Sequence, residues 1–278
     1  MGARTPLHGP RRTWILGDVR LPHVRGPMAG ATLQRRLTWL QARLSRRLDE
    51  TPRAKTLVLD VPGWPSHMAG QHVDVRLTAA DGYQAQRSYS IASPPDDQDQ
   101  LSLTVERIEN GEVSPYLTDV LAEGEQLELR GPIGGYFVWS TESGGPLFLI
   151  AGGSGVCPLM AMIRQRAARG SHVPARLLYS ARSLEEIIYK KELDQRAESA
   201  DGLEVFYTLT RSQPPGWRGG SRRIDRAMLA EVGFGAEQLP LCMVCGPTPI
   251  VEAVASTLVE LGHRPDRVKT ERFGPTGG

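Results

Sequence analysis

The sequence predicts two domains in tandem, an antiparallel six-stranded β-barrel followed by an α/β domain with a doubly wound parallel sheet. From residue 38 to about 130, short runs of alternating apolar and polar residues are separated by Gly and Pro turns, which is typical of an antiparallel barrel. After about residue 142, continuous apolar runs alternate with helical patterns, which is typical of a parallel sheet covered by helices. The length of 278 residues, of which 40% are hydrophobic, allows two cores of this kind.

Composition excludes several functional classes. The net charge of +2 gives no general attraction to nucleic acid or to membranes. We find no run of about 18 apolar residues, so no membrane span is expected. Three cysteines cannot build a disulfide framework, which indicates a reducing, cytoplasmic location. Arginine supplies 29 of the 33 basic residues, so a single arginine is weak support for a binding site.

Residues 1–36 differ from the rest of the chain. They are rich in Arg, Pro and Gly, and Asp18 is their only acid. We interpret them as an N-terminal extension that is only partly ordered, with an organelle transit segment or a start codon assigned too early as alternatives. The predicted barrel domain then spans 37–141 and the α/β domain 142–278.

The first barrel strand presents a conflict. Leucines at 33, 37, 40, 44 and 48 recur at helical spacing. We nevertheless predict a strand over 38–48, with a helix over 31–37 ahead of it, because the family resemblance described below places a strand there. The other predicted barrel strands are 56–61, 71–77, 86–92, 101–107 and 126–130, with a short helix over 114–122.

The α/β domain is predicted in chain order from its apolar runs and helical patterns. The expected strands are 147–151, 175–180, 203–210, 241–245 and 268–272. The expected helices are 158–168, 184–198, 224–232 and 248–261.

Five short motifs occur in an order and at distances that resemble the ferredoxin–NADP reductase superfamily of flavoproteins. They are Arg87-Ser88-Tyr89-Ser90, Gly131 to Phe137, Gly152 to Pro158, Cys245-Gly246-Pro247 and Glu271-Arg272-Phe273. The resemblance covers residues 38–278. It implies a flavin-binding barrel, FAD rather than FMN as the flavin, and hydride transfer from a nicotinamide C4 to the flavin N5.

The same resemblance assigns the flavin site. Arg87 would bind the diphosphate, Tyr89 would lie along the isoalloxazine ring, and Ser90 would hydrogen-bond near N5 within the motif that also contains Ser88. Val113 and Ser114 belong to a second flavin segment, Gly111 to Leu117. Here Ser114 is predicted to cap a helix whose free N–H groups suit a phosphate. A surface arginine, a strand tyrosine and an ordinary capped helix are the structural alternatives.

A glycine loop between a buried strand and a helix is the context of a nucleotide site. Gly152, Gly153, Ser154 and Gly155 would let the cofactor diphosphate approach the backbone at a helix N-terminus. No acid ends the second strand of this domain. Arg182 follows that strand and Arg211 the next, and an arginine accommodates a 2′-phosphate, so we predict NADPH over NADH.

Cys242 and Cys245 form a C-x-x-C, but three residues apart on a strand they point to opposite faces. We therefore expect neither a redox pair nor a metal site. By resemblance, Cys245, Gly246 and Pro247 lie beside the nicotinamide, Glu271 lies near the cysteine, and Phe273 covers the flavin. Ser90, Cys245, Glu271 and Phe273 are the catalytic candidates. The six histidines show no ligand spacing, and we predict surface or packing roles for them.

The predicted function is an oxidoreductase that passes electrons from NADPH through FAD to a separate acceptor. Many relatives carry a fused [2Fe–2S] domain, and the three cysteines lack its C-x4-C-x2-C spacing. The acceptor would be a ferredoxin, a haem or molybdenum protein, or a small molecule. Two alternatives remain open here, a flavin- or nucleotide-binding regulatory or electron-transfer subunit without turnover, and a flavin-free dehydrogenase.

Overall fold

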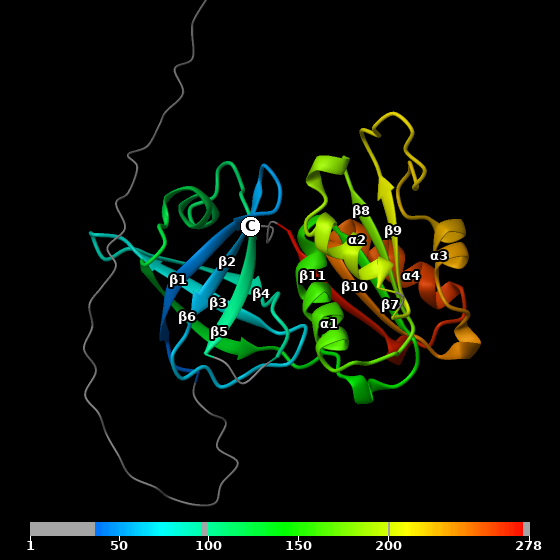
Figure 1. Ribbon diagram of the computed structural model, residues 1–278, viewed down its shortest axis with the longest axis horizontal. Helices are drawn as coiled ribbons and strands as arrows, with labels where there is room; N and C mark the ends of the chain where they lie inside the picture. The colour runs from blue at the N-terminus through cyan, green and yellow to red at the C-terminus, as the bar shows by residue number, and fades with distance from the viewer. Residues whose placement is uncertain (1–36, 96–98, 200, 275–278) are drawn as a thin grey trace, which may run out of the picture.

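The computed structural model describes residues 37–95, 99–199 and 201–274, which form two domains side by side (Figure 1). The first contains a six-stranded antiparallel sheet and the second a five-stranded parallel sheet with helices. The predicted fold class is confirmed. The N-terminal extension, the helix predicted over 31–37 except for its last residue, and residues 275–278 lie outside the described part of the chain.

The six strands of the first domain follow the order β4-β3-β6-β1-β2-β5 in the sheet. Ile91, directly after β4, bridges Leu103 of β5, and this bridge brings the two outer strands together as a barrel requires. A π-helical turn, η1 (Tyr116–Val120), separates the last two strands. The strands are β1 (Leu40–Asp49), β2 (Ala54–Asp60), β3 (His72–Thr78), β4 (Gln84–Ser90), β5 (Gln100–Glu106) and β6 (Gln126–Ile133).

The strand prediction for β1 is correct, and the helical spacing of its leucines is coincidental. The strand pairs with both β2 and β6. Leu40, Ala42 and Leu44 point toward the barrel interior with the two-residue period of a strand, whereas Leu48 is exposed. The register shifts between Leu44 and Arg46, so the alternation does not continue through the strand.

The second domain has the strand order β11-β10-β7-β8-β9. The chain therefore winds outward in both directions from β7, and the switch point lies between β7 and β10. Five short 3₁₀ turns join the longer elements; they are Thr141–Ser143, Gly153–Gly155, Leu184–Glu186, Ala236–Gln238 and Pro265–Arg267. The strands are β7 (Leu147–Gly152), β8 (Ala175–Ala181), β9 (Leu203–Leu209), β10 (Leu241–Pro247) and β11 (Val268–Phe273), and the helices are α1 (Val156–Ala168), α2 (Lys190–Glu198), α3 (Arg226–Val232) and α4 (Thr248–Glu260).

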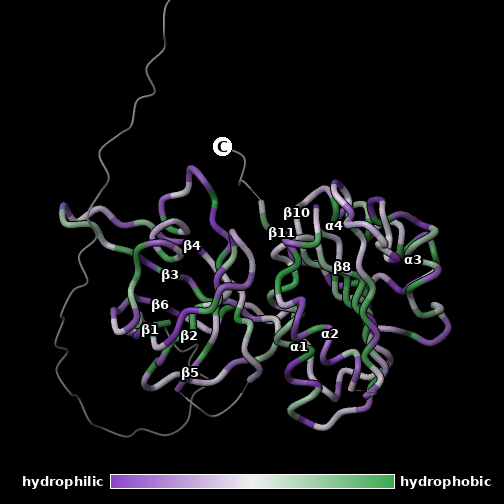
Figure 2. The backbone as a smooth tube through the Cα atoms, turned by 45° about the horizontal axis from the view of Figure 1, so that its top comes forward, coloured by the Kyte–Doolittle hydropathy of each residue, from purple (hydrophilic) through white to green (hydrophobic). Residues whose placement is uncertain are grey.

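Both faces of the parallel sheet are buried, as the continuous apolar run in β7 predicts. Leu147 and Leu149 belong to a core cluster shared with α1, whereas Phe148 and Ile150 belong to a second cluster shared with α3 and α4. The apolar strands form the green centre of this half of the molecule in Figure 2. Barrel residues Ala69, Ala92 and others join the first cluster, so the two domains share hydrophobic core. No helix in the described ranges is long and apolar enough to cross a membrane.

The helix predicted over 184–198 is interrupted. A 3₁₀ turn covers Leu184–Glu186, and α2 begins only at Lys190. Between them Ile187, Ile188 and Tyr189 are each 3% exposed, and Tyr189 adopts a left-handed conformation with φ of 61°. Burial of three consecutive large side chains is incompatible with a one-sided amphipathic helix, which explains the break.

Candidate active site

Strand β4 carries the motif Arg87-Ser88-Tyr89-Ser90 at the edge of the barrel sheet. Tyr89 packs against the barrel core, and burial raises the pKa of its phenol well above the usual range. The Arg87 side chain is 55% exposed, and its guanidinium lies 3.7 Å from the Glu112 carboxylate. This cation is therefore accessible to an anionic ligand, which fits a flavin diphosphate.

Ser88 differs from its neighbours in the motif. Its hydroxyl donates to the Asp74 carboxylate at 2.7 Å, and Asp74 in turn pairs with Arg130 at 2.9 Å. The side chain of Ser88 is thus committed to a polar network on β3 and β6. For Ser88 itself, only the backbone is left to contact a ligand, whereas the Arg87 side chain remains exposed.

The second predicted flavin segment is folded differently from expectation. The Ser114 hydroxyl accepts from the Ile108 N–H at 3.0 Å, and η1 has no side-chain cap. The predicted capping role of Ser114 is therefore wrong, because the preceding loop already uses its hydroxyl oxygen. Val113 is 1% exposed and packs in the barrel core, so its side chain does not reach a cofactor.

Three side chains from different strands meet where the domains face each other. The Cys245 thiol on β10 donates to Glu271 Oε2 on β11 at 3.9 Å. His72 Nδ1 on β3 lies 3.9 Å from Glu271 Oε1, and His72 is the strand partner of Ser90. The predicted catalytic residues Ser90, Cys245 and Glu271 therefore belong to one neighbourhood that spans both domains.

Burial controls the protonation of this cluster. It raises the pKa of the Glu271 carboxyl to about 7, and the hydrogen bond from Cys245 opposes this shift. Burial, followed by the adjacent Glu271 charge, raises the pKa of the Cys245 thiol well above its usual value. Burial also lowers the pKa of His72, with the nearby Asp74 charge opposing the shift. Near neutral pH the thiol and the imidazole are uncharged, and Glu271 is partly protonated.

The glycine loop after β7 lies against the end of β10, at the switch point of the sheet. A Cβ on Gly155 would lie 2.1 Å from the carbonyl oxygen of Cys245, and one on Gly246 would lie 3.1 Å from Gly152 Cα. Only glycine allows these two backbones to approach so closely. Gly153, with φ of 55°, faces open space instead.

Beside this loop is a cavity of about 810 Å³, a volume within the usual range for small-molecule and cofactor sites. Gly153, Ser154 and Pro247 line it, and so does Phe273, which is 38% exposed. The walls of the cavity therefore include residues of the predicted nucleotide segment and the end of β11.

Four arginines also line the cavity, and these suit an anionic ligand. Arg182 is paired with Glu186 at 3.3 Å, whereas no ion pair involves Arg211 or Arg223 among the residues that the structure describes. Arg53 enters the cavity from the barrel, together with Glu106, whose carboxylate accepts from the Ser154 hydroxyl at 2.8 Å.

Sequence reasoning missed four residues of this region, His72, Arg53, Glu106 and Arg223. The pairing of β3 with β4 places His72 opposite Ser90, and the sequence carries no signal for that register. Arg53 and Glu106 come from the other domain. Arg223 is one arginine in an arginine-rich chain. The predicted placement of the C-x-x-C side chains on opposite faces of β10 is confirmed, because Cys245 and Cys242 lie in different core clusters.

Comparison with known proteins identifies both domains. Residues 41–138 match the oxidoreductase FAD-binding domain family, and residues 149–256 match the oxidoreductase NAD-binding domain family. A glycine betaine monooxygenase reductase subunit of Pseudomonas aeruginosa is 34% identical over 209 residues, which are 74% of this chain and 56% of the relative. The chain thus spans just over half the length of that protein.

Two further matches cover more of the compared protein. NADH-cytochrome b5 reductase 1 of Cryptococcus neoformans is 30% identical over 70% of this chain and 68% of its own length. The structure of a ferredoxin NADP+ reductase from Neisseria gonorrhoeae has the same fold, with a TM-score of 0.71 and 21% identity over 84% of this chain and 98% of that one. Together with the site geometry, these matches show that the chain belongs to the ferredoxin–NADP reductase family of FAD- and NAD(P)-binding oxidoreductases.

Proposed function

We propose that this chain transfers a hydride from NADPH to FAD and passes the electrons on to a separate acceptor. The observation that carries the proposal is the contact across the domain boundary. His72, the strand partner of Ser90, touches Glu271, and Glu271 touches Cys245 beside the nucleotide cavity. Such an arrangement allows a flavin held by the barrel and a nicotinamide held by the second domain to meet.

In this proposal each domain supplies different residues. Arg87 binds the flavin diphosphate, Tyr89 lies along the ring, Ser90 hydrogen-bonds near N5, and the Val113–Ser114 backbone contacts the phosphates. FAD supplies the N5 atom that accepts the hydride. Cys245 and Glu271 hold the nicotinamide side of the site, and Phe273 covers the flavin. The shared hydrophobic core between the domains excludes water from this region.

The nucleotide half of the proposal uses the glycine loop and the free arginines. Gly152 to Gly155 approach the diphosphate, and Gly246 and Pro247 pack beside Gly152. Arg211 and Arg223 bind the 2′-phosphate of NADPH, and Arg182 assists from its pair with Glu186. Because one relative is named for NADH, the choice between the two nucleotides needs a direct test.

That test compares kcat/KM for NADPH and NADH in wild type and in Arg211→Ala and Arg223→Ala. A charge-assisted bond is worth about 1.5–3 kcal/mol, so each variant should lose roughly ten- to a hundredfold with NADPH and little with NADH. Arg218→Ala, in the same loop but outside the cavity, is the matched control. Equal losses with both nucleotides would assign the arginines to the shared diphosphate or to the fold.

The names of two relatives support the proposal of a separate electron acceptor. One is named as the reductase subunit of a monooxygenase and another as a reductase of cytochrome b5. A ferredoxin-type protein, a haem or molybdenum protein, or a small molecule would take this role here.

The first experiment is an absorbance spectrum of the pure protein, recorded before and after addition of NADPH without oxygen. We expect flavin bands that NADPH bleaches, and FAD released on heating. A colourless protein would exclude a flavin enzyme. A yellow protein whose flavin neither NADPH nor NADH reduces would support the non-catalytic alternative.

A further inference from the structure

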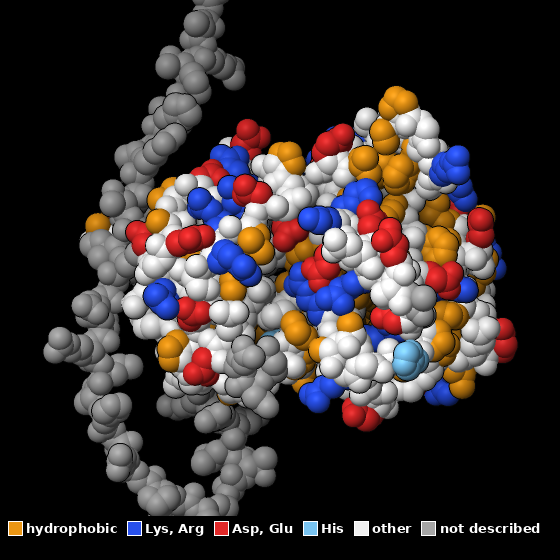
Figure 3. Space-filling view, in the orientation of Figure 1, with side chains coloured by type: hydrophobic (Ala, Val, Ile, Leu, Met, Phe, Trp, Pro, Cys, Tyr) orange, Lys and Arg blue, Asp and Glu red, His pale blue; other side chains and the backbone are white. Residues whose placement is uncertain are grey.

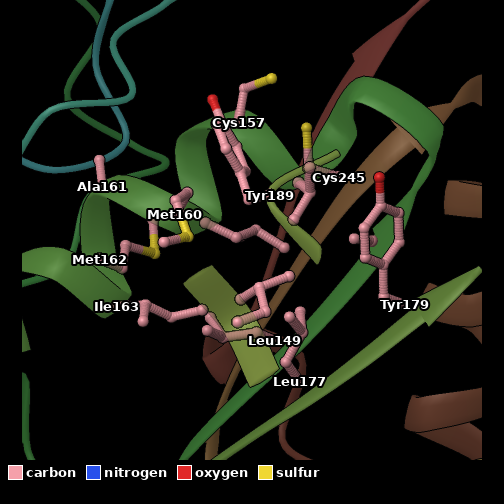
Figure 4. Packing of buried hydrophobic residues seen from close by; sticks show 14 of the residues in the cluster. Leu149, Cys157, Met160, Ala161, Met162, Ile163, Leu177, Tyr179, Tyr189 and Cys245 are labelled. Atoms are coloured by element: carbon pink, nitrogen blue, oxygen red, sulfur yellow. The ribbon is translucent and has the colours of Figure 1, made fainter. Parts of the chain in front are cut away.

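Tyr189 of the nucleotide domain reaches into the barrel. Its phenol hydrogen-bonds the Thr104 hydroxyl on β5, although the two residues are 85 positions apart. Both side chains are buried, Tyr189 at 3% and Thr104 at 5% exposure. In Figure 4 the Tyr189 ring lies beside Cys157 near the start of α1, with its hydroxyl at the edge of the hydrophobic cluster. This is a polar contact between the domains, next to the hydrophobic core that they share.

The barrel side of this contact is held by further hydrogen bonds. The Thr104 and Thr56 hydroxyls lie 2.7 Å apart, and Thr56 donates to the Glu50 carboxylate at 2.7 Å. The Cys157 thiol at the start of α1 donates to the Thr104 carbonyl at 3.9 Å. Thr104 is therefore a fixed point, because its hydroxyl and its carbonyl are both engaged.

The nucleotide-domain side is equally constrained. Tyr189 follows the buried Ile187–Ile188 pair and has a left-handed backbone conformation directly before α2. The Arg164 guanidinium of α1 lies 4.9 Å from the centre of that ring and also donates to the barrel carbonyl of Ala92 at 2.8 Å. Glu192 of α2 pairs with the same guanidinium at 2.5 Å. These contacts leave Tyr189 little freedom to move relative to α1.

Strand β5 also contacts the nucleotide loop directly, two residues beyond Thr104. Glu106 accepts from Ser154 at 2.8 Å, on the wall of the cavity. The same strand thus holds Tyr189 at one point and the glycine loop at the next. A shift of the domains at Thr104 would move the glycine loop relative to β4 of the barrel.

We propose that Tyr189 and Thr104 are a positioning pair, which sets the nucleotide domain on the barrel at the spacing that hydride transfer requires. The inference rests on the proposed function. Neither residue touches the cofactor cavity, so the pair acts through the domain arrangement. A misplacement of about 1 Å can slow such a reaction on the order of a hundredfold, while ground-state binding changes little.

The test uses Tyr189→Phe and Thr104→Val, which remove one hydroxyl each and keep the shape. Tyr179→Phe is the matched control, because the buried Tyr179 hydroxyl accepts from the Ile188 N–H wholly within the nucleotide domain. With NADPH at saturation, rapid mixing should show flavin reduction slowed about ten- to a hundredfold in the Tyr189 and Thr104 variants. The dissociation constant for NADPH and the FAD content should change little, and Tyr179→Phe should keep the wild-type reduction rate.

A second measurement needs neither cofactor nor turnover. In a double-mutant cycle on urea unfolding, Tyr189→Phe and Thr104→Val should couple, by about fivefold in the unfolding equilibrium constant. Tyr179→Phe and Thr104→Val should be additive. Additive effects of the first pair, or flavin reduction in Tyr189→Phe as fast as in Tyr179→Phe, would overturn the inference. Failure of the wild type to be reduced would instead refute the proposed function, and the unfolding cycle would still decide whether the pair joins the domains.

Discussion

Burial of the Glu271 carboxyl makes its protonation sensitive to pH near neutrality. The carboxyl is held between the Cys245 thiol and the His72 imidazole, neither of which is a permanent cation that would stabilise the charged form. The pKa therefore rises from 4.5 to about 7. A carboxyl with this pKa exchanges protons in the physiological range, as residues that transfer protons in active sites often do.

This shift has a consequence for stability. Between pH 4.5 and 7 the folded state binds more protons at Glu271 than the unfolded chain does. The contribution of Glu271 to the free energy of unfolding is therefore complete below pH 4.5 and is lost as the pH rises through 7. We expect wild type to lose about 2–3 kcal/mol relative to Glu271→Gln between pH 5 and pH 8. Urea unfolding at both pH values measures this difference. Glu252→Gln, on the exposed side of α4, is the control. If the difference in the free energy of unfolding between wild type and Glu271→Gln does not change with pH, the raised pKa of Glu271 is contradicted.

Arg87 is the residue whose removal should most directly weaken flavin binding. A charge-assisted hydrogen bond to phosphate contributes about 1.5–3 kcal/mol, so Arg87→Ala should raise the dissociation constant for FAD about ten- to a hundredfold. Equilibrium titration of the flavin-free protein measures this constant.

Arg43→Ala provides a matched control, because Arg43 is also an exposed barrel arginine paired with a carboxylate, here Asp60 at 2.8 Å. Its affinity for FAD should equal that of wild type. Unchanged affinity in Arg87→Ala would show that the motif on β4 does not bind the flavin diphosphate.

At the scale of elements, the loop between β7 and α1 depends on close backbone packing. Two of its glycines are needed for different reasons. Gly155 has an ordinary φ of −61° but no room for a Cβ, whereas Gly153 has room and a left-handed φ. The packing against β10 thus positions the loop whose Gly153 and Ser154 line the cavity, and it depends on Gly155 for steric reasons alone.

Gly155→Ala should therefore displace the loop from Cys245, with a loss of more than about 2 kcal/mol in stability and weaker nucleotide binding. Gly170→Ala is the control, since Gly170 has a φ of 57° and nothing within 4 Å of its added Cβ. That change should cost only the left-handed conformation, about 1–2 kcal/mol, and leave binding intact. Thermal unfolding and nucleotide titration of both variants distinguish them. Gly155→Ala with wild-type affinity would show that the loop tolerates the displacement.

At the scale of the molecule, two domains that share hydrophobic core hold the candidate site at their boundary. Lys and Arg side chains gather along part of this boundary together with acidic ones, on the face shown in Figure 3. An acceptor that takes electrons from the flavin would approach this region. Electron-transfer interfaces are usually small and transient, so charge should influence the encounter more than buried area.

We expect rapid NADPH-dependent reduction of ferricyanide or a dye, and slow reduction of cytochrome c until a partner protein is added. The partner-dependent rate should fall as salt rises, because screening weakens charge steering. Steady-state turnover with each acceptor across ionic strength measures both effects. Fast cytochrome c reduction by this chain alone, unaffected by added protein, would contradict the need for a partner. Fast turnover with O₂ alone would indicate an oxidase.

Within the described residues, the sequence by itself determined the fold class and the positions of the strands and helices, except around Tyr189 and in β1, where the helical spacing of the leucines misled and the family resemblance gave the strand. These features depend on local periodicity, on glycines between a strand and a helix, and on motif order, which are all readable along the chain. The apolar run of β7 predicted burial on both faces, and the C-x-x-C spacing placed its two cysteines on opposite faces.

Only the tertiary structure decided which side chains meet. His72 joins Glu271 because β3 and β11 come from different domains that face each other, and Ser88 and Ser114 turn to other partners because β3 and the loop before η1 lie next to them. The break before α2 follows from burial of Tyr189 against the barrel. Most of these contacts join residues far apart in the sequence, such as the 85 positions between Thr104 and Tyr189. They depend on strand register and domain packing, for which hydrophobic periodicity carries no signal.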